Sequence, residues 1–425
     1  MKDARYAVVT ALCKMHDSGS WSNLVLDGLT DGLDGRERAF ASALFYGTLT
    51  RQLTLDACIA AHSKIPIAKM DSAVLAILRT GIYQLLYMDA VPEHAAVGEA
   101  VRLVRRVRRA SAAGFVNAVL RSFLRAGKAV PLPEGSPDLR LSTKYSCDVE
   151  LAKMLIDNYG EDKAAMILLD STLPPPAFIR VNTLKTTDAQ LMDLLKKRGV
   201  DAAADESLPH CLITHGAGAL HSLPEFRQGL FHVQDRSSQL CAVTLAPQPG
   251  RRVLDVCAAP GGKSFLMAQM MENMGELVCC DLHEHRIGLI EKRAQEMCVE
   301  IIRTKIADMS MPHPDLGQFE RVLCDVPCSG YGTMRRRPEI KYKSPQKFAA
   351  LPDIQYKILE NSSDYCKDGG LLLYSTCTLN PAENDMVVDR FLESRKTFTQ
   401  VSRIRIMPGE NGGDGFFMAL LRKSG

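Results

Sequence analysis

The sequence predicts a multidomain protein: an all-helical N-terminal domain, a small α+β domain, and an α/β domain with a doubly wound, largely parallel sheet. Three observations predict it. Apolar residues recur at three-to-four spacing up to about residue 127, short strand-like runs then mix with helical segments, and apolar strands finally alternate with helices. We expect domains over 1–128, 141–245 and 246–425. The linker over 129–140 gathers Pro, Gly and Ser without periodicity.

The first two domains contain recognisable helix starts and ends. In the helical domain, Asp71 and Pro92 precede amphipathic runs and are expected to begin helices. In the second domain "CDVELAKMLIDNYG" and "DAQLMDLLKKRG" each end at a glycine that can cap a helix. The segments "AFIRVNTL", "CLITH" and "LFHVQD" are expected to be short strands.

The third domain repeats a strand–helix pattern. Its strands are expected in "RRVLDVCA", "GELVCCDL", "EIIRTKIAD", "FERVLCDV" and "GGLLLYSTC". The last two segments, "FTQVSRIRI" and "GFFMALLRK", flank a glycine-rich turn and predict an antiparallel pair at one edge of the sheet.

Composition and charge bear on three properties: membrane insertion, nucleic-acid binding and the redox compartment. No stretch approaches the roughly 18 to 20 apolar residues of a membrane span, and the net charge of +3 is too small to indicate a nucleic-acid partner by itself. Two basic runs are candidate phosphate contacts, or alternatively solvated surface. Their residues are Arg105 and Arg106, and Arg335, Arg336, Arg337 and Lys341. The cysteines lack disulfide or zinc spacing, which favours a reducing cytoplasm and no metal.

Four acids end successive predicted strands: Asp255, Asp281, Asp308 and Asp325. Ligands of such sheets bind outside the carboxyl ends of the strands. The turn "CAAPGGKS" lacks the glycine patterns of pyrophosphate and triphosphate binders, so the acids suit a ligand with ribose hydroxyls and a positive centre. S-adenosylmethionine fits this description, whereas any single acid could simply cap a loop.

Two thiols accompany the acid of the fourth strand. Cys328 lies in "DVPCSGYG" and Cys377 in "YSTCTLNP", at neighbouring strand ends. Carbon 5 of cytosine accepts a methyl group only after a thiolate has added to carbon 6, and a nearby acid must stabilise the charge on the ring. Asp325 with either thiol could supply this chemistry, and the chemistry alone does not rank the two thiols.

The motifs "LDVCAAPGGKS", "DVPCSGYGTMRRRPEIKY" and "YSTCTLNPAEND" resemble the signatures of RNA 5-methylcytosine methyltransferases, most closely the bacterial Sun/Fmu (RsmB-type) enzymes of 16S ribosomal RNA. The resemblance covers essentially the whole chain. The first 127 residues are similar to a NusB-like RNA-binding domain, and the middle domain is similar to an RRM-like one. Val326, Ser264, Tyr342 and Ala382 depart from the commoner residues of the family.

The resemblance implies roles for individual residues. Cys377 would be the nucleophile, Cys328 would assist release of the adduct, and Asp325 would face the target base beside the cofactor. Arg286 and Asp281 would lie at the cofactor, Asp281 on its ribose, and Asp308 by its adenine. The loop that holds its methionine end would comprise Cys257, Ala258, Ala259, Pro260, Gly261, Gly262 and Lys263.

The expected function is S-adenosylmethionine-dependent cytosine-C5 methylation of 16S ribosomal RNA by a cytoplasmic monomer, with no membrane or metal partner. Transfer RNA as the substrate is one alternative. A non-catalytic RNA-binding or ribosome assembly factor is another, although it predicts damaged motifs and both thiols, Asp325 and the glycine turn are intact.

Overall fold

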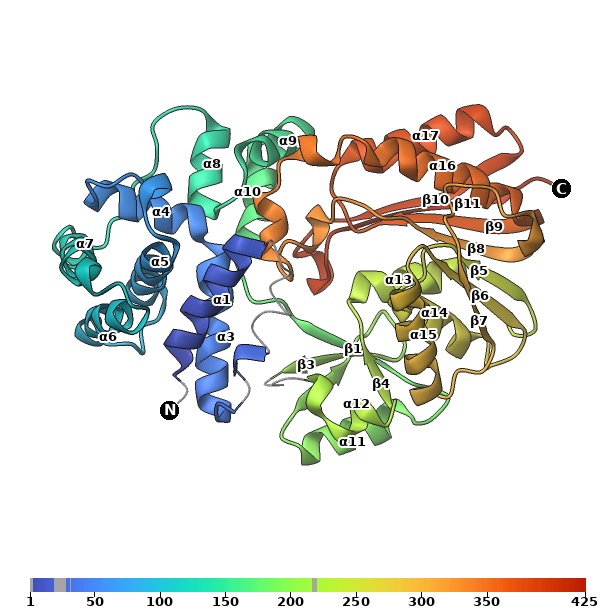
Figure 1. The fold of residues 1–425 in the computed structure, drawn as a ribbon. Coiled ribbons are helices and arrows are strands. Elements are labelled where there is room, and N and C mark those ends of the chain that lie inside the picture. Colours follow the sequence, from blue (N-terminus) through green and yellow to red (C-terminus); the bar gives the residue numbers. More distant parts are fainter. Residues whose placement is uncertain (1–2, 19–27, 31, 216–219) are drawn as a thin grey trace. The chain divides into compact units, whose positions relative to one another are not determined.

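The computed structural model describes residues 3–18, 28–30, 32–215 and 220–425 (Figure 1). The chain divides into two compact units. The first contains Met1–Leu173 together with Met334–Ser344, and the second contains Pro174–Thr333 together with Pro345–Gly425. This division runs through the predicted middle domain, and the domain limits given above remain predictions.

The first unit is helical, as predicted. Its helix α5 (Ser72–Tyr87) is apolar on nearly all sides and forms the centre of the core, because the other helices pack around it. Asp71 caps α5 by accepting hydrogen bonds from the N–H groups of Ala73 and Val74. The other α-helices with assigned bounds are α1 (Ala4–Ser18), α3 (Gly35–Thr50), α4 (Gln52–His62), α6 (Glu93–Arg106), α7 (Ala113–Arg125), α8 (Pro137–Tyr145), α9 (Val149–Tyr159) and α10 (Glu161–Asp170).

The arginine-rich segment 334–344 packs within this helical unit. Lys341 is completely buried, and its Nζ donates hydrogen bonds to the carbonyl of Tyr145 (2.8 Å) and to Ser171 Oγ (3.4 Å). The hydroxyl of Tyr342 donates to the carbonyl of Leu49 at 2.7 Å. Arg335 pairs with Asp170 at 3.0 Å. The segment is therefore held by buried polar contacts.

The second unit contains a four-stranded antiparallel sheet in the order β2-β3-β1-β4, with β1 at Ala177–Val181, β2 at Asp201–Ala204, β3 at Cys211–His215 and β4 at Phe231–Val233. One face packs its apolar residues against α11 (Asp188–Lys197). The sequence did not predict β2, because its run "DAAA" has weak strand propensity and is mostly exposed.

The larger sheet of the second unit has seven strands in the order β10-β11-β9-β8-β5-β6-β7. The five parallel strands are β5 (Arg252–Asp255), β6 (Glu276–Asp281), β7 (Ile302–Ile306), β8 (Phe319–Asp325) and β9 (Cys366–Thr376). Strands β10 (Phe398–Ile406) and β11 (Phe416–Lys423) add an antiparallel edge, as predicted.

Helices cover both faces of this sheet (Figure 1). One apolar cluster joins one face to α13 (Arg236–Leu245), α14 (Gly262–Met270) and α15 (Glu284–Glu296). A second cluster joins the other face to α16 (Leu351–Asp364) and α17 (Asp385–Ser394). The strand order reverses between β5 and β8, which is where doubly wound sheets open a ligand crevice.

The burial of Lys341 makes the stability of the protein depend on pH. Burial, with a smaller contribution from Arg51, holds the pKa of Lys341 down to about 7, whereas an unfolded lysine has a pKa of about 10.4. Between these values the unfolded chain binds a proton that the folded chain has released. The stability contributed by this residue therefore rises with pH in that window, by at most about 1.4 kcal/mol per pH unit.

We therefore expect the wild-type protein to gain stability relative to Lys341→Met between pH 7 and about pH 9. Urea unfolding of both proteins at the two pH values measures this difference. A difference in the free energy of unfolding that stays constant with pH would contradict the buried, neutral lysine.

Candidate active site

The loop between β5 and α14 carries the predicted cofactor residues 257–263. Its backbone is tied to β6 by a hydrogen bond from the N–H of Ala258 to the carbonyl of Cys280 (2.8 Å). Gly261 has φ +102°, and a Cβ there would lie 2.4 Å from the ring of Phe265, so this turn requires glycine. Below the loop, Asp255 accepts a hydrogen bond from Ser264 Oγ at 2.6 Å, and burial raises the pKa of Asp255 to about 7.

Asp281 and Arg286 hold the same loop from the end of β6. The Asp281 carboxylate is buried, accepts the N–H of Ala259 at 3.3 Å, and pairs with Arg286 at 3.1 Å. The Arg286 guanidinium also donates to the carbonyl of Ala259 at 2.8 Å. Asp308, after β7, is exposed and accepts two hydrogen bonds from Ser310, which lower its pKa.

Lys263 points from this loop to the end of β8. Its Nζ lies 2.7 Å from Asp325 Oδ2, and Asp325 Oδ1 accepts a hydrogen bond from Ser375 Oγ at 2.8 Å. Burial by itself lowers the pKa of Lys263, but the Asp325 carboxylate and other negative neighbours outweigh it and raise the pKa above the usual value. In the sequence, Lys263 belongs to the predicted cofactor loop. The structure joins its ammonium to the carboxylate expected at the target base.

The two predicted thiols lie together. The Sγ atoms of Cys328 and Cys377 are 3.3 Å apart, and both residues are half-buried. The hydrogen bond with Cys377, and then burial, raise the pKa of the Cys328 thiol well above its ordinary value. The backbone of Gly332 supports this end of β9, because its N–H donates to the carbonyl of Cys377 at 2.9 Å.

Glu383, which was not predicted from the sequence, organises the loops behind both thiols. Its completely buried carboxylate accepts hydrogen bonds from the N–H of Ser329 (2.8 Å), from Gln355 Nε2 (3.0 Å) and from Asn380 Nδ2 (3.1 Å). A buried carboxylate with several donors rigidifies the groups that it joins. Its position six residues after Cys377 in "NPAEN" was the only signal in the sequence.

The predicted RNA contacts lie in the helical unit, and one of them is wrong. The complete burial of Lys341 contradicts a phosphate contact, since its ammonium is turned inward to backbone carbonyl and hydroxyl groups. Arg335 and Arg336 are half-buried and Arg337 is exposed. Arg105 and Arg106 lie exposed on α6, where Arg106 pairs with Asp3 at 2.7 Å.

Within the described ranges, no cluster of three or more His, Cys, Asp or Glu side chains is placed to hold a metal ion. In the same part of the chain, no helix has the length and apolarity needed to cross a membrane.

Comparison with known proteins extends these observations over the whole chain. Three family models match: "16S rRNA methyltransferase RsmB/F" over residues 242–422, the "NusB family" over 2–125, and an RsmF/B-like "ferredoxin-like domain" over 151–221. They confirm the predicted three-part fold class. The crystal structure of PH0851 has a TM-score of 0.85 at 23% identity, covering 99% of this chain and 98% of that one, and thus shares the fold.

Two curated relatives align from end to end. The probable ribosomal RNA small subunit methyltransferase B of Bacillus subtilis is 34% identical, with 99% of each chain covered. The corresponding protein of Synechocystis is 31% identical, with each chain covered completely. With the predicted thiols, acids and glycine turn assembled at one end of the sheet, this similarity shows that the chain belongs to the family of ribosomal RNA small subunit methyltransferases B.

Proposed function

We propose that this chain transfers a methyl group from S-adenosylmethionine to carbon 5 of a cytosine in small-subunit (16S) ribosomal RNA, through a transient bond between Cys377 and carbon 6. The observation that carries the proposal is the pair of thiols 3.3 Å apart, with the Lys263–Asp325 ion pair on the neighbouring strand end. The names of the end-to-end relatives support ribosomal RNA as the substrate.

The residues around the β5–α14 loop suit the cofactor. The buried Asp281 carboxylate offers an acceptor for ribose hydroxyls, and the adjacent Leu282, 56% exposed, offers an apolar surface for the adenine. Asp308 lies at the next strand end, and the loop from Cys257 to Lys263 would hold the methionine end. When bound, S-adenosylmethionine supplies an electrophilic methyl group.

The Lys263–Asp325 pair can distinguish cytosine from uracil. Paired with an ammonium, Asp325 is a carboxylate and accepts hydrogen bonds, as the exocyclic amino group of cytosine requires. The Lys263 ammonium can donate to the ring nitrogen or carbonyl and stabilise the negative charge that develops there. Uracil would turn a carbonyl oxygen toward the carboxylate and would be repelled.

The two thiols divide the covalent chemistry between them. The thiolate of Cys377 adds to carbon 6, and the electrons of the C5–C6 double bond then take the methyl group at carbon 5. A water molecule accepts the proton on carbon 5, the electrons of that C–H bond restore the C5–C6 double bond, and the C6–S bond breaks with its electrons going to the sulfur. Cys328, whose raised pKa keeps it protonated at neutral pH, can give a proton to the departing sulfur across 3.3 Å. The assignment of Cys377 as the nucleophile follows the family resemblance of the Thr-Cys motif.

The proposed setting is the reducing cytoplasm, where the protein acts as a monomer. All thirteen cysteines are free, as expected for working or buried thiols in that compartment.

Replacing each thiol separates their roles. Cys377→Ser should reduce turnover by at least about a thousandfold, because the nucleophile is lost. Cys328→Ser should still add to the base and accumulate a covalent protein–RNA adduct, seen on a denaturing gel. Cys298→Ser, at an exposed thiol, is the matched control and should behave as wild type. Wild-type turnover by Cys377→Ser would refute the assignment.

Gly332→Ala tests whether the backbone contact between Gly332 and Cys377 positions the proposed nucleophile. An added Cβ would lie 1.9 Å from the carbonyl oxygen of Gly415, so the backbone that carries Cys377 must shift. We expect kcat to fall by about tenfold or more, since small misplacements of reacting groups are costly. The S-adenosylmethionine affinity from calorimetry should change less than about twofold. Gly98→Ala, where a Cβ meets open space, is the control. An unchanged kcat would contradict this role.

Bisulfite sequencing of RNA from a strain that lacks the gene tests the substrate. We expect one 5-methylcytosine to be lost from 16S ribosomal RNA and restored by the wild-type gene but not by Cys377→Ser. Loss from transfer RNA instead would favour the first alternative. An unchanged pattern, together with no binding of S-adenosylmethionine in calorimetry, would favour the non-catalytic assembly factor.

A further inference from the structure

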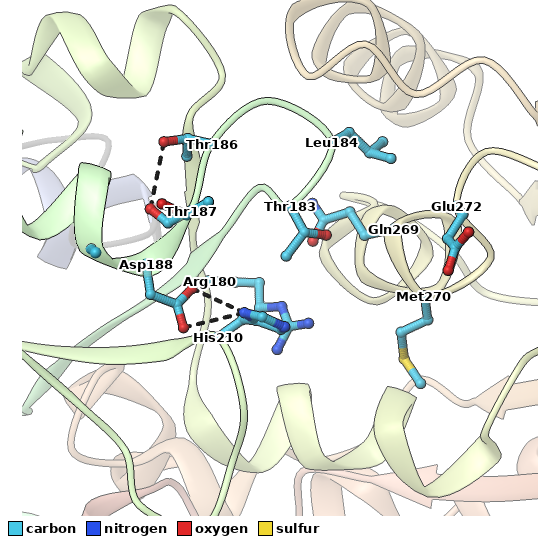
Figure 2. A pocket seen from close by; sticks show the side chains of 11 residues that line it. Arg180, Thr183, Leu184, Thr186, Thr187, Asp188, His210, Gln269, Met270 and Glu272 are labelled. Atoms are coloured by element: carbon cyan, nitrogen blue, oxygen red, sulfur yellow. Dashed lines mark hydrogen bonds and ion pairs between the residues drawn. The ribbon is translucent and has the colours of Figure 1, made fainter.

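A pocket lies within the second unit, between the small antiparallel sheet and the end of α14 (Figure 2). It has a volume of about 710 Å³, enough for a nucleotide-sized ligand. Its lining comes from β1, from the loop into α11, and from the last turn of α14. Lys263 lies in the first turn of α14 and Gln269 six residues later, about 9 Å along the axis. Neither Cys328 nor Cys377 lines this pocket.

Arg180 provides a buried positive charge at this pocket. Its side chain is only 4% exposed, and among the described residues its one hydrogen bond goes to the carbonyl of Pro209, while its Nε has no partner. The carboxylate of Asp188 acts on Arg180 through its charge without forming an ion pair with it, and it contacts His210 Nδ1 at 2.9 Å. Burial lowers the pKa of Arg180 to about 10, as expected for a guanidinium whose charge is incompletely compensated. A buried cation in this state favours an anionic ligand.

Gln269 supplies a second unsatisfied polar group to the lining of this pocket. It is 4% exposed, and neither its Oε1 nor its Nε2 has a hydrogen-bond partner in the described part of the chain. Figure 2 shows Arg180 and His210 on the side of Asp188, and Gln269 on the side of Met270 and Glu272. An amide that offers one donor and one acceptor matches the edge of a nucleobase.

The remaining residues that line the pocket are of types that contact the base and the phosphate of a nucleotide. Leu184 and Met270 are partly buried and offer apolar contact for the face of a base. Thr183 and Thr187 are exposed hydroxyl-bearing residues at the rim. The one other acid of the lining, Glu272, is also exposed, so its charge is solvated rather than directed at the floor.

We propose that this pocket binds one unpaired nucleotide of the RNA substrate, with its phosphate on Arg180 and the edge of its base on Gln269, at a position that flanks the methylated cytosine. The inference rests on the proposed RNA methyltransferase function and adds a subsite to it. Proteins that read RNA in a sequence-dependent way bind unpaired bases splayed into such pockets. The subsite would help to select which cytosine reaches Cys377.

Binding of a fluorescein-labelled single-stranded RNA, followed by anisotropy at fixed salt, tests the subsite in the full-length protein. Arg180→Met and Gln269→Met should each weaken RNA binding by about tenfold or more, because each removes hydrogen bonds in a desolvated site. Arg227→Met removes the same charge from an exposed position of the small domain and should change the affinity less than about twofold. Wild-type affinity in both pocket variants would overturn the proposal.

Kinetics separate this subsite from the catalytic site. Both pocket variants should raise KM for RNA while kcat at saturating RNA and the affinity for S-adenosylmethionine stay at wild-type values. A fall in kcat with unchanged KM would overturn the subsite. Should the wild-type protein fail to methylate RNA, the proposed function fails, but the anisotropy comparison still decides whether the pocket binds RNA.

Calorimetry distinguishes an RNA phosphate from other phosphates. Cytidine monophosphate should bind the wild-type protein weakly, and Arg180→Met should abolish that binding. If cytidine monophosphate or inorganic phosphate binds at Arg180 while RNA affinity is unchanged in both variants, the pocket is a site for small anions and the RNA assignment is overturned.

Thermal unfolding separates a structural role from a ligand-binding one. Replacing an uncompensated buried cation by an apolar side chain of similar size is commonly neutral or stabilising. Arg180→Met should therefore unfold at the same temperature as the wild-type protein or higher. A marked loss of stability in Arg180→Met, combined with wild-type RNA affinity in Gln269→Met, would show that Arg180 has a structural role. That result would overturn the proposal.

Discussion

The ion pair between Lys263 and Asp325 joins the parts of the site. Lys263 comes from the first turn of α14 and Asp325 from the end of β8, so the contact links the cofactor loop to the adjacent strand. Ser375 of β9 donates to the other oxygen of the same carboxylate. Three neighbouring strand ends thereby share one charged group. Because the pair is largely buried, removing either partner would leave an uncompensated charge.

Behind this pair, buried polar groups rather than apolar packing determine where the thiols lie. Glu383 gathers donors from the Cys328 loop, from α16 and from the turn after β9. Asn384 accepts from the hydroxyl of Thr376 and donates to the carbonyl of Thr378 at 3.0 Å, on either side of Cys377. A buried network of this kind favours one arrangement, because alternatives would leave further donors and acceptors unpaired.

The same reasoning separates the basic residues by function. Lys341 is buried against carbonyl groups, and Arg335 is paired with Asp170, so part of the arginine-rich segment serves the packing of the helical unit. Arg180 is also buried, but it lines a pocket, and its Nε has no hydrogen-bond partner among the described residues. A run of basic residues in the sequence does not reveal these differences in tertiary environment.

The sequence by itself predicted much of the local structure and the candidate residues of the site. Apolar periodicity predicted the helical region, the parallel strands and the antiparallel edge, and capping residues such as Asp71 predicted helix starts. These signals depend on neighbours within a few residues. It also identified the candidate acids and thiols, because each follows a strand whose end is predictable.

Only the tertiary structure decided which distant residues each side chain contacts. The 3.3 Å contact between Cys328 and Cys377 and the pairing of Lys263 with Asp325 join residues 49 and 62 positions apart. The burial of Lys341, the network around Glu383 and the pocket at Arg180 likewise depend on residues distant in the chain. Strand β2 was missed because pairing with β3, rather than its own propensity, makes it a strand. The spacing of residues along the chain does not predict which distant group a side chain contacts. That contact determines the side chain's burial, its charge state and its role.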